Sequence, residues 1–357
     1  MTVDGWAFPV AGDTRFTWAY DVERERLLAL YAKGKDKQWD AQKRIEWQLD
    51  LDDENPLGMP VEIVPIWGVP AFEKRLAEPG ELTRVRRELQ RQQISQFLHG
   101  EQGAMITAAR IVETVPDIDS KFYASTQTMD EARHCETFDK LLRDKMGMEP
   151  RPITKPLADL LHETLSDSRW DMPYLGMQVL IEGLALAAFG GLRDHSTSPL
   201  ARQVVAYVMQ DEARHVAFGR MALKDAYADL TEKERDEREE FVVEACYLMR
   251  DRFRHPELWD DLGYDSKEVL AHTESTPGVQ LFRNRLFTRI VPCIKDIGLW
   301  GERVQKAYAD MGVLEFAAAN LDGLMADDER TADDIDAARV EARRREIDAT
   351  IAAGRDS

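Results

Sequence analysis

Two short motifs in the sequence combine residue types that bind transition metals. The pentapeptide Asp-Glu-Ala-Arg-His occurs at residues 130–134 and again at residues 211–215. A further glutamate lies 30 residues before the glutamate of each copy, so the whole pattern repeats with an offset of 81 residues. Carboxylates and imidazoles are common ligands of divalent transition metals. The six candidate ligands are Glu101, Glu131, His134, Glu182, Glu212 and His215.

The spacing of these residues predicts that they meet at one level of a helical bundle. The midpoints of the two 30-residue intervals fall at Pro116 and Thr197, and both lie in stretches rich in turn residues. A helix that turns and returns antiparallel brings residues equidistant from the turn to the same height. In Glu-x-x-His, the spacing of three also places both side chains on one helix face. Two such hairpins packed together would gather four carboxylates and two imidazoles.

The position of Glu182 indicates that these carboxylates are buried. This glutamate interrupts an apolar run that extends over residues 179–189. A buried carboxylate is costly unless it is paired or bound to a metal, and four clustered carboxylates cannot all stay ionised without a compensating cation. Two divalent metals with two neutral imidazoles would neutralise them. The alternative is a duplicated helical hairpin whose acidic residues form only salt bridges, and it does not explain a glutamate inside an apolar run.

Charged neighbours in each motif are expected to support the ligands. An aspartate lies four residues before each motif histidine, and an arginine lies directly before that histidine. We expect each aspartate to accept a hydrogen bond from the histidine of its own motif, at the ring nitrogen that faces away from the metal. The arginines are expected to hold the aspartates, whereas the other histidines are expected at the surface or at helix ends. These supporting residues are Asp130, Asp211, Arg133 and Arg214.

The elements that must position these residues are predicted to be helices. Apolar residues recur at spacings of three and four, and period-two alternation is scarce. We expect a single all-α domain over residues 1–357, a four-helix bundle with additional helices. Its expected parts are an N-terminal arm and helices (1–82), the di-metal core (83–225), additional helices (226–322) and a charged C-terminal tail (323–357). Helices are predicted within 21–50 and at 83–114, 119–146, 156–165, 173–192, 199–228, 231–254, 278–299, 301–321 and 327–345.

Composition narrows the classes of partner and compartment. Lys plus Arg total 47 and Asp plus Glu total 66, so the formal charge is −19. Such a surface repels phosphate backbones and anionic lipid, so neither nucleic acid nor a membrane is expected as a partner. The sequence shows no signal peptide and no apolar run long enough to span a bilayer. Its three cysteines are far apart, which argues against a disulfide scaffold or an iron–sulfur cluster. We expect a cytoplasmic protein.

At the repeated motifs, the sequence resembles the ferritin-like superfamily of di-iron carboxylate proteins. The resemblance covers roughly residues 83–225. The Asp-Glu-x-Arg-His form looks most like the hydroxylase α subunits of bacterial multicomponent monooxygenases. It is also similar to stearoyl-carrier-protein desaturases and to ribonucleotide reductase small subunits. The resemblance implies a ferritin-like bundle in which the six candidate ligands bind two irons, or a manganese–iron pair, that activate O2.

The sequence departs from several members of this superfamily at single positions. Phe138 stands where the radical-generating reductase subunit has a tyrosine, which argues against a stable tyrosyl radical. Leu186 stands where the multicomponent hydroxylases have a threonine. Val208 stands where the p-aminobenzoate N-oxygenases carry an extra histidine ligand. Each departure argues against one particular activity and leaves the two-metal site in place.

Apolar residues one turn from the ligands are candidates for a substrate pocket, although they could equally be core residues. A dry cavity beside two metals suits oxidation of a small hydrophobic substrate. We therefore predict an oxygenase or oxidase that catalyses hydroxylation, N-oxygenation or desaturation. The alternatives are a ferroxidase or iron-handling protein, or a radical-generating subunit of a larger complex. The candidate pocket residues are Phe97, Met105, Phe138, Leu186, Val208 and Phe218.

Partners are predicted from signatures that the sequence lacks. It contains no Gly-x-Gly-x-x-Gly loop, no flavin signature and no cluster of cysteines. Electrons would then come from a separate reductase or ferredoxin, or from the substrate. The helices outside the core are expected to build a homodimer interface.

Overall fold

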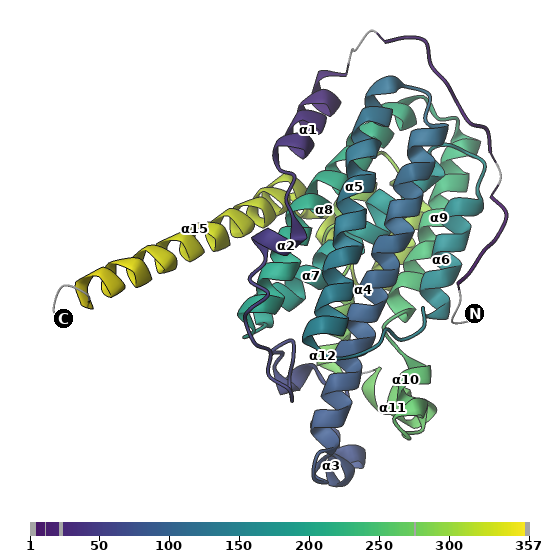
Figure 1. Cartoon of the computed structure of the whole chain (residues 1–357). Helices are drawn as coiled ribbons and strands as arrows, with labels where there is room; N and C mark the ends of the chain where they lie inside the picture. Colours follow the sequence, from purple (N-terminus) through teal and green to yellow (C-terminus); the bar gives the residue numbers. More distant parts are fainter. Residues whose placement is uncertain (1–4, 11, 21–23, 275, 354–357) are drawn as a thin grey trace.

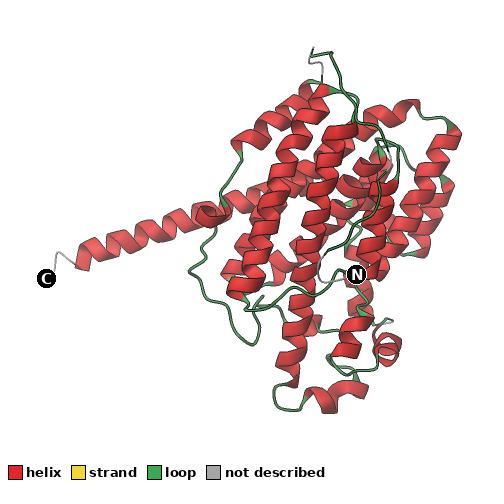
Figure 2. Ribbon diagram, turned by 45° about the vertical axis from the view of Figure 1, so that its right-hand side comes forward, coloured by secondary structure: helices red, strands yellow, loops and turns green. Residues whose placement is uncertain are grey.

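Four long helical segments run side by side at the centre of the molecule (Figure 1). The computed structural model describes residues 5–10, 12–20, 24–274 and 276–353. Helix α4 (Glu81–Thr114) pairs with α5 (Ile118–Lys140) in the first hairpin. In the second hairpin, a π-helix, η3 (Tyr174–Ile181), continues into α7 (Glu182–His195), which pairs with α8 (Pro199–Ala226). No β-strand occurs in the described ranges (Figure 2), so the prediction of an all-α fold is confirmed.

Both hairpin turns contain residues that stop one helix and start the next. The residue before a proline disfavours helical backbone, and α4 ends just before Val115 and Pro116. The Asp117 carboxylate then accepts a hydrogen bond from the Ser120 backbone N–H at 2.8 Å and caps α5. In the second hairpin, the Ser198 hydroxyl caps α8 in the same way. These caps place the two hairpin turns where the spacing of the glutamates predicts them.

Shorter elements surround this bundle. α1 and α2 precede α4, and α15 follows the last short helices and projects far from the body in Figure 1. The bounds are α1 (Glu25–Asp36), α2 (Ala41–Arg44), η1 (Val61–Ile63), α3 (Pro70–Leu76), η2 (Leu141–Lys145), α6 (Lys155–Ser166), η4 (Tyr227–Asp229), α9 (Glu232–Asp251), α10 (Pro256–Asp261), α11 (Ser266–Thr273), α12 (Pro277–Arg285), α13 (Ile290–Asp296), α14 (Glu302–Asp310), η5 (Leu314–Ala318) and α15 (Leu321–Ala353).

Three long helices expected from the sequence are broken in the structure. The 21–50 pattern forms α1 and α2, with Asp21 outside the described residues, and the 278–299 pattern forms α12 and α13. The 301–321 pattern ends at Asp310, because Gly312 has a φ of 71° and terminates the helix. Apolar spacing continues through these breaks, since the turn residues Leu286 and Phe287 are themselves buried. Periodicity alone therefore overestimates the helix lengths.

Most buried residues form one apolar core around the four long segments. A smaller cluster fills the space between α3, α10, α11 and the start of α4, with Phe72 and Trp259 among its members. The expectation that no apolar run is long enough to span a bilayer needs correction, because the segment Tyr174–His195 meets that length and composition; 83% of its most apolar stretch is buried inside the protein. This segment is the innermost part of the second hairpin and carries one of the candidate ligands.

Candidate metal centre

Each of the four long segments contributes to a buried cluster of carboxylates and imidazoles. α4 and α7 each provide one glutamate, and α5 and α8 each provide a Glu-x-x-His pair. All six side chains are between 0% and 5% exposed. They fall into two groups whose ligand atoms lie within 4.8 Å of one another, and each group could hold a metal ion. One group is Glu101, Glu131, His134 and Glu212, and the other is Glu131, Glu182, Glu212 and His215.

The two groups are related by the 81-residue repeat. Adding 81 to the positions of Glu101 and His134 gives Glu182 and His215. Glu131 and Glu212 belong to both groups, so each lies between the two candidate ion positions. The structure therefore brings all six predicted ligands together, in the arrangement expected for two metal ions.

The histidine rings are oriented by aspartates on the opposite helix. His134 Nε2 lies 3.1 Å from Asp211 Oδ2, and His215 Nε2 lies 3.2 Å from Asp130 Oδ2. If each Nε2–H donates to its aspartate, each Nδ1 keeps a lone pair, and this nitrogen faces the glutamates. His134 Nδ1 lies 3.2 Å from Glu101 Oε2 and from Glu131 Oε2. The side chains are thus set up for metal binding through Nδ1.

This pairing differs from the one expected from the sequence. Each aspartate serves the histidine of the other motif, so Asp130 and Asp211 connect α5 to α8 instead of bonding within one helix. The reason is the direction of the rings: their Nδ1 atoms face the glutamates, which turns their Nε2 atoms toward the opposite helix. The expected role of the arginines holds, because Arg133 contacts both aspartates and Arg214 contacts Asp211.

The pKa shifts follow from burial and from the crowding of like charges. Burial, and then the Glu212 charge, raise the pKa of both Glu101 and Glu182 well above the usual range. Burial alone would lower the pKa of His134, but hydrogen bonds to Asp211 and to the glutamates outweigh it and raise that pKa. Two carboxyl groups with raised pKa values, beside imidazoles whose pKa values are also raised, indicate a shortage of positive charge in the cluster.

Several buried polar atoms of the cluster have no hydrogen-bond partner among the described residues. They include both carboxylate oxygens of Glu212, Oε2 of Glu182 and Nδ1 of His215. Their near neighbours are other atoms of the cluster: Glu212 Oε1 lies 3.1 Å from His134 Nδ1, and His215 Nδ1 lies 3.0 Å from Glu131 Oε1. Buried polar atoms without partners are uncommon in native proteins, and their lone pairs here converge on the two candidate ion positions. The residues present therefore fit two divalent cations. Carboxylate and imidazole donors of this kind suit iron and manganese.

A glutamine pair next to the ligands was not anticipated from the sequence. Gln127 Nε2 donates to Glu182 Oε1 at 2.8 Å and to Glu131 Oε1 at 3.1 Å, and Gln178 Nε2 donates to Gln127 Oε1 at 3.1 Å. In the repeat, the counterparts of Gln127 and Gln178 are apolar: residue 208 is valine and residue 97 is phenylalanine. The two halves of the centre thus differ, and this difference between repeat copies was the available sequence signal.

The segment between α1 and α2 also contacts the centre. Trp39 Nε1 donates to Asp211 Oδ2 at 2.7 Å, and Gln38 Nε2 donates to Asp130 Oδ1 at 2.6 Å. Each of these side chains fixes an aspartate that in turn orients a histidine. These partners lie about 90 to 170 residues from the aspartates in sequence, so no local spacing could reveal them.

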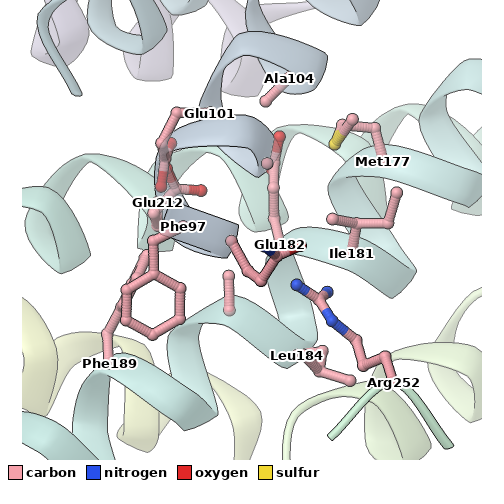
Figure 3. A pocket seen from close by; sticks show the side chains of 13 residues that line it. Phe97, Glu101, Ala104, Met177, Ile181, Glu182, Leu184, Phe189, Glu212 and Arg252 are labelled. Atoms are coloured by element: carbon pink, nitrogen blue, oxygen red, sulfur yellow. The ribbon is translucent and has the colours of Figure 1, made fainter. Parts of the chain in front are cut away.

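A cavity opens beside the Glu101, Glu182 and Glu212 carboxylates (Figure 3). About 390 Å³ of space not filled by atoms lies among its lining residues, and this figure includes space that is open to solvent. Its apolar wall comes mainly from α4, η3 and α7, and the polar side chains of Gln96 and Arg252 also line it. The apolar wall residues are Phe97, Gly100, Ala104, Met177, Ile181, Leu184, Ala185 and Phe189.

Of the six residues expected to form a pocket, the cavity includes Phe97 and excludes the other five. Phe138, Leu186, Val208 and Phe218 are buried in the core, and Met105 is half-buried on α4. The cavity is lined by Ala104 and Ala185, which lie three positions after Glu101 and Glu182. The residues four positions after these two ligands do not line it. On a helix these two positions differ by about 100° in direction. Spacing alone could not choose between them.

The chain is similar to one protein family and to several solved structures. Residues 21–298 match the family described as P-aminobenzoate N-oxygenase AurF. Among solved structures, a variant of an R2-like ligand-binding oxidase with an anaerobically reconstituted Mn/Fe cofactor is 14% identical, with a TM-score of 0.50. That match covers 79% of this chain and 99% of the other. The same type of oxidase after photoconversion is 14% identical over 79% and 99% of the two chains, with a TM-score of 0.48.

The match with a TM-score of 0.50 shows a shared fold, and no curated protein sequence matches the chain. The family match extends over more than three quarters of the sequence and includes all six cluster residues. The resemblance to di-iron carboxylate proteins is thereby confirmed. The chain belongs to the AurF family of p-aminobenzoate N-oxygenases and is an oxidoreductase with a site for two metal ions.

Proposed function

We propose that the protein is a di-iron oxygenase that oxidises the nitrogen of a small aromatic amine. The observation that carries this proposal is the cavity beside the metal centre. It is lined by apolar residues and by three carboxylates of the cluster, in a chain whose family is described by N-oxygenation. Phe97 and Phe189 are in contact, with ring centroids 4.6 Å apart, and an aromatic ring packed beside this pair would bring a substituent close to the metal positions.

The six clustered residues would hold two irons, or one manganese and one iron, and the bound metals would supply the activation of O2. With metals bound, Asp211 and Asp130 would accept hydrogen bonds from the Nε2–H groups of the histidines and leave the Nδ1 lone pairs to the metals. Gln127 holds one oxygen of Glu182 and leaves the other free to bind a metal. The apolar wall would limit the access of water to the reacting atoms.

The chain matches the family although position 208 holds a valine and not a histidine. Val208 is fully buried in α8, so no seventh ligand comes from this position. We propose that this protein works with six protein ligands. The additional coordination positions would then be open to O2 or to solvent.

Two other functions are less well supported. A ferroxidase needs no cavity for an organic molecule, whereas the cavity here has aromatic walls. A radical-generating subunit of the tyrosyl type would need an oxidisable side chain at Phe138. That phenylalanine packs instead against Phe97 and Phe189, with ring centroids 5.6 Å away in both cases.

We further propose a cytoplasmic homodimer that receives electrons from a separate reductase or ferredoxin. The long helix α15 supports the dimer, because its outer half projects from the body and exposes Val340 and Ile347 (Figure 1). Sedimentation equilibrium of the purified protein checks the dimer. A monomeric mass at micromolar concentration would contradict it.

The decisive test of the activity combines metal content with product analysis. Protein loaded with ferrous iron under anaerobic conditions is mixed with O2 and 4-aminobenzoate, with a chemical reductant, and the products are identified by mass spectrometry. We expect about two irons per chain and products that carry oxygen from O2 on nitrogen. Iron oxidation with no change in any aromatic amine would support the ferroxidase alternative. Oxygen on carbon would support hydroxylation.

A further inference from the structure

The outer side of the first hairpin, formed by α4 and α5, exposes no charge over several helical turns, in a chain whose formal charge is −19. Between Arg91 and Arg110, the only aspartate, glutamate, lysine or arginine is the buried ligand candidate Glu101. Between Lys121 and Glu136, the three charged residues belong to the buried motif. We call the exposed residues of these two stretches the hairpin face: Gln102, Ile106, Ala109, Phe122, Ser125, Met129 and Ala132.

The hairpin face has the spacing of a surface that packs against other helices. Its residues on α5 follow one another at intervals of three, four and three positions, and those on α4 at intervals of four and three. Such intervals form the buried seam between packed helices. Ile106, Phe122 and Met129 are nevertheless 51%, 37% and 63% exposed. In Figure 1, α4 and α5 lie at the front of the bundle with no other helix across them.

The second hairpin shows what covers the equivalent surface there. Adding 81 to each position of the hairpin face gives seven residues of α7 and α8, of which six are buried and one is half-buried. Later parts of the same chain cover them. A Cβ added to Gly183 would lie 3.1 Å from Ile290 of α13, and Gln210 Nε2 donates to Asp333 Oδ1 of α15 at 3.1 Å. The seven counterparts are Gly183, Ala187, Gly190, Gln203, Ala206, Gln210 and Ala213.

A second copy of the chain is the partner that fits the hairpin face. Each chain carries a formal charge of −19, so two copies repel each other where their charged surfaces meet. An uncharged face removes this repulsion at the contact, and depletion of charge is typical of the buried centre of an interface. A reductase or ferredoxin would instead be guided by complementary charge, which the hairpin face does not offer.

The exposed apolar area near this face is large enough for a stable interface. Arg15 N donates to Glu113 O at 2.9 Å, which attaches the N-terminal arm to the tip of the hairpin. The next residues of the arm include three aromatic side chains that are 61–79% exposed: Phe16, Trp18 and Tyr20. With the three large apolar residues of the hairpin face, they expose an area on the order of 700 Å². A standard interface buries about 800 Å² on each partner.

We propose that the hairpin face of one chain packs against the hairpin face of a second copy, around a twofold axis. This proposal rests on the proposed homodimer and names its interface. The pairing supplies to the first hairpin the cover that α13 and α15 supply to the second. The outer half of α15 is less suited to the central contact, because Val340 and Ile347 lie among the charged residues 343–345.

A charge placed on the hairpin face tests this interface. In a monomer, M129E and I106E each put a carboxylate at an exposed position, so the chain should fold normally. In the dimer, the same carboxylates would be buried in a contact between two acidic chains. Sedimentation equilibrium of the full chain at micromolar concentrations should show a dimer for the wild type. Both variants should weaken dimerisation by about 100-fold or more.

Two controls separate the position of the charge from its presence. V340E adds the same charge on α15 at an apolar residue that is 61% exposed, close to the 63% of Met129, and it should leave the dimerisation constant unchanged. M129L keeps the face apolar and should remain a dimer. Circular dichroism should be the same for the wild type and all four variants. These measurements require no turnover, so they are independent of the test of N-oxygenation.

Four results would overturn the proposal. A monomeric wild type would contradict the homodimer and its interface together. A dimeric wild type whose M129E and I106E variants dimerise equally well would leave the homodimer in place and refute this interface. Dissociation by V340E and not by M129E would place the interface on α15. Equal dissociation by all three glutamate variants would show that added charge, and not its position, separates the chains.

Discussion

His134 and His215 show how much of the centre depends on individual atoms. In each ring, one nitrogen faces the glutamates and the other faces an aspartate of the opposite helix. That aspartate is itself held by an arginine and by Trp39 or Gln38. A substitution at a ligand should therefore weaken metal binding. The bundle around the ligands is held by many other contacts, so its helices should remain folded.

Replacement of Glu182 by alanine tests the ligand assignment directly. Glu182 is 2% exposed and belongs to one of the two ion groups, so its loss should remove at least one metal per chain. Helical content should stay close to that of the wild type, since the variant removes a buried charge from an apolar run. Metal analysis and circular dichroism measure both properties. E136A, at an exposed position on α5, is the control; two metals per chain in E182A would show that Glu182 is not a ligand.

His255 makes a second prediction, which concerns stability and pH. Burial, followed by Arg252 and Arg151, lowers its pKa to about 3 in the folded state, whereas the unfolded value is near 6.5. Between these values the unfolded state binds a proton that the folded state does not, so stability is complete above about pH 6.5 and falls as the pH falls. His255 was expected at the surface or at a helix end; it does cap α10, and it is half-buried there.

The variant H255N removes this titration and suits the backbone, because His255 has a φ of 48° and asparagine tolerates the left-handed region. Between pH 7 and pH 5 the wild type should lose roughly 1–2 kcal/mol more unfolding free energy than H255N. Urea unfolding at several pH values measures this difference. Parallel pH curves for the two proteins would contradict the prediction.

At the scale of elements, the π-helix η3 places the second hairpin against the metal centre. It ends directly before Glu182, and π-helical turns are frequently found at functional sites. Met177 and Ile181 of this element line the cavity, whereas Gln178 reaches Gln127 beside the ligands. A single π-helical segment therefore supplies both a cavity wall and a support for a ligand.

Gly219 on α8 makes room for this arrangement. A Cβ atom at Gly219 would lie 2.5 Å from Gln178 Cβ, which real side chains do not tolerate. We expect G219A to lower the unfolding free energy by about 1–3 kcal/mol and to disturb the Gln178–Gln127 hydrogen bond. The control is G191A in α7, where a Cβ meets nothing within 4 Å and should stabilise the helix by about 0.5–1 kcal/mol. Thermal unfolding of both variants checks this; equal effects would contradict the packing argument.

At the scale of the whole molecule, the first half of α15 ties distant parts of the chain together. Tyr207 on α8 donates to Asp336 Oδ1 at 2.6 Å, and Lys33 on α1 lies 2.6 Å from Glu329. Asp328 is 1% exposed and forms ion pairs with Arg193 of α7, at 3.0 Å, and with Arg289 in the turn before α13. The charged C-terminal helix expected from the sequence is thus docked in its first half and exposed in its second half.

Removal of the Asp328 carboxylate should strongly weaken this docking. D328A leaves two mostly buried arginines without their shared partner, so we expect a loss of about 3 kcal/mol in unfolding free energy. The neighbouring control D327A removes an exposed carboxylate that pairs with Arg330 and should change stability by less than about 0.5 kcal/mol. Chemical denaturation measures both. Similar losses of unfolding free energy in the two variants would mean that the buried ion pairs of Asp328 contribute little to stability.

The sequence by itself determined the six clustered residues, the two hairpins and the all-α class. These follow from local rules: a spacing of three places side chains on one helix face, and equal distances from a turn place them at one height. Duplication of the pattern made Glu101 and Glu182 recognisable, although neither belongs to a motif of its own. Helix ends were less predictable, because apolar residues continue through turns such as Arg285–Ile290.

Only the tertiary structure decided which faces of the helices meet. The exchange of Asp130 and Asp211 between motifs, the contact of Trp39 with Asp211 and the approach of Arg252 to the cavity all join residues far apart in sequence. Neighbouring positions on a helix differ by about 100° in direction, and this difference decides on which side of the ligands the cavity lies. Sequence spacing does not show which of the two positions faces the cavity, because several helices pack into the same volume. Local periodicity specifies what a helix can present, whereas packing of the whole chain selects what each presented side chain touches.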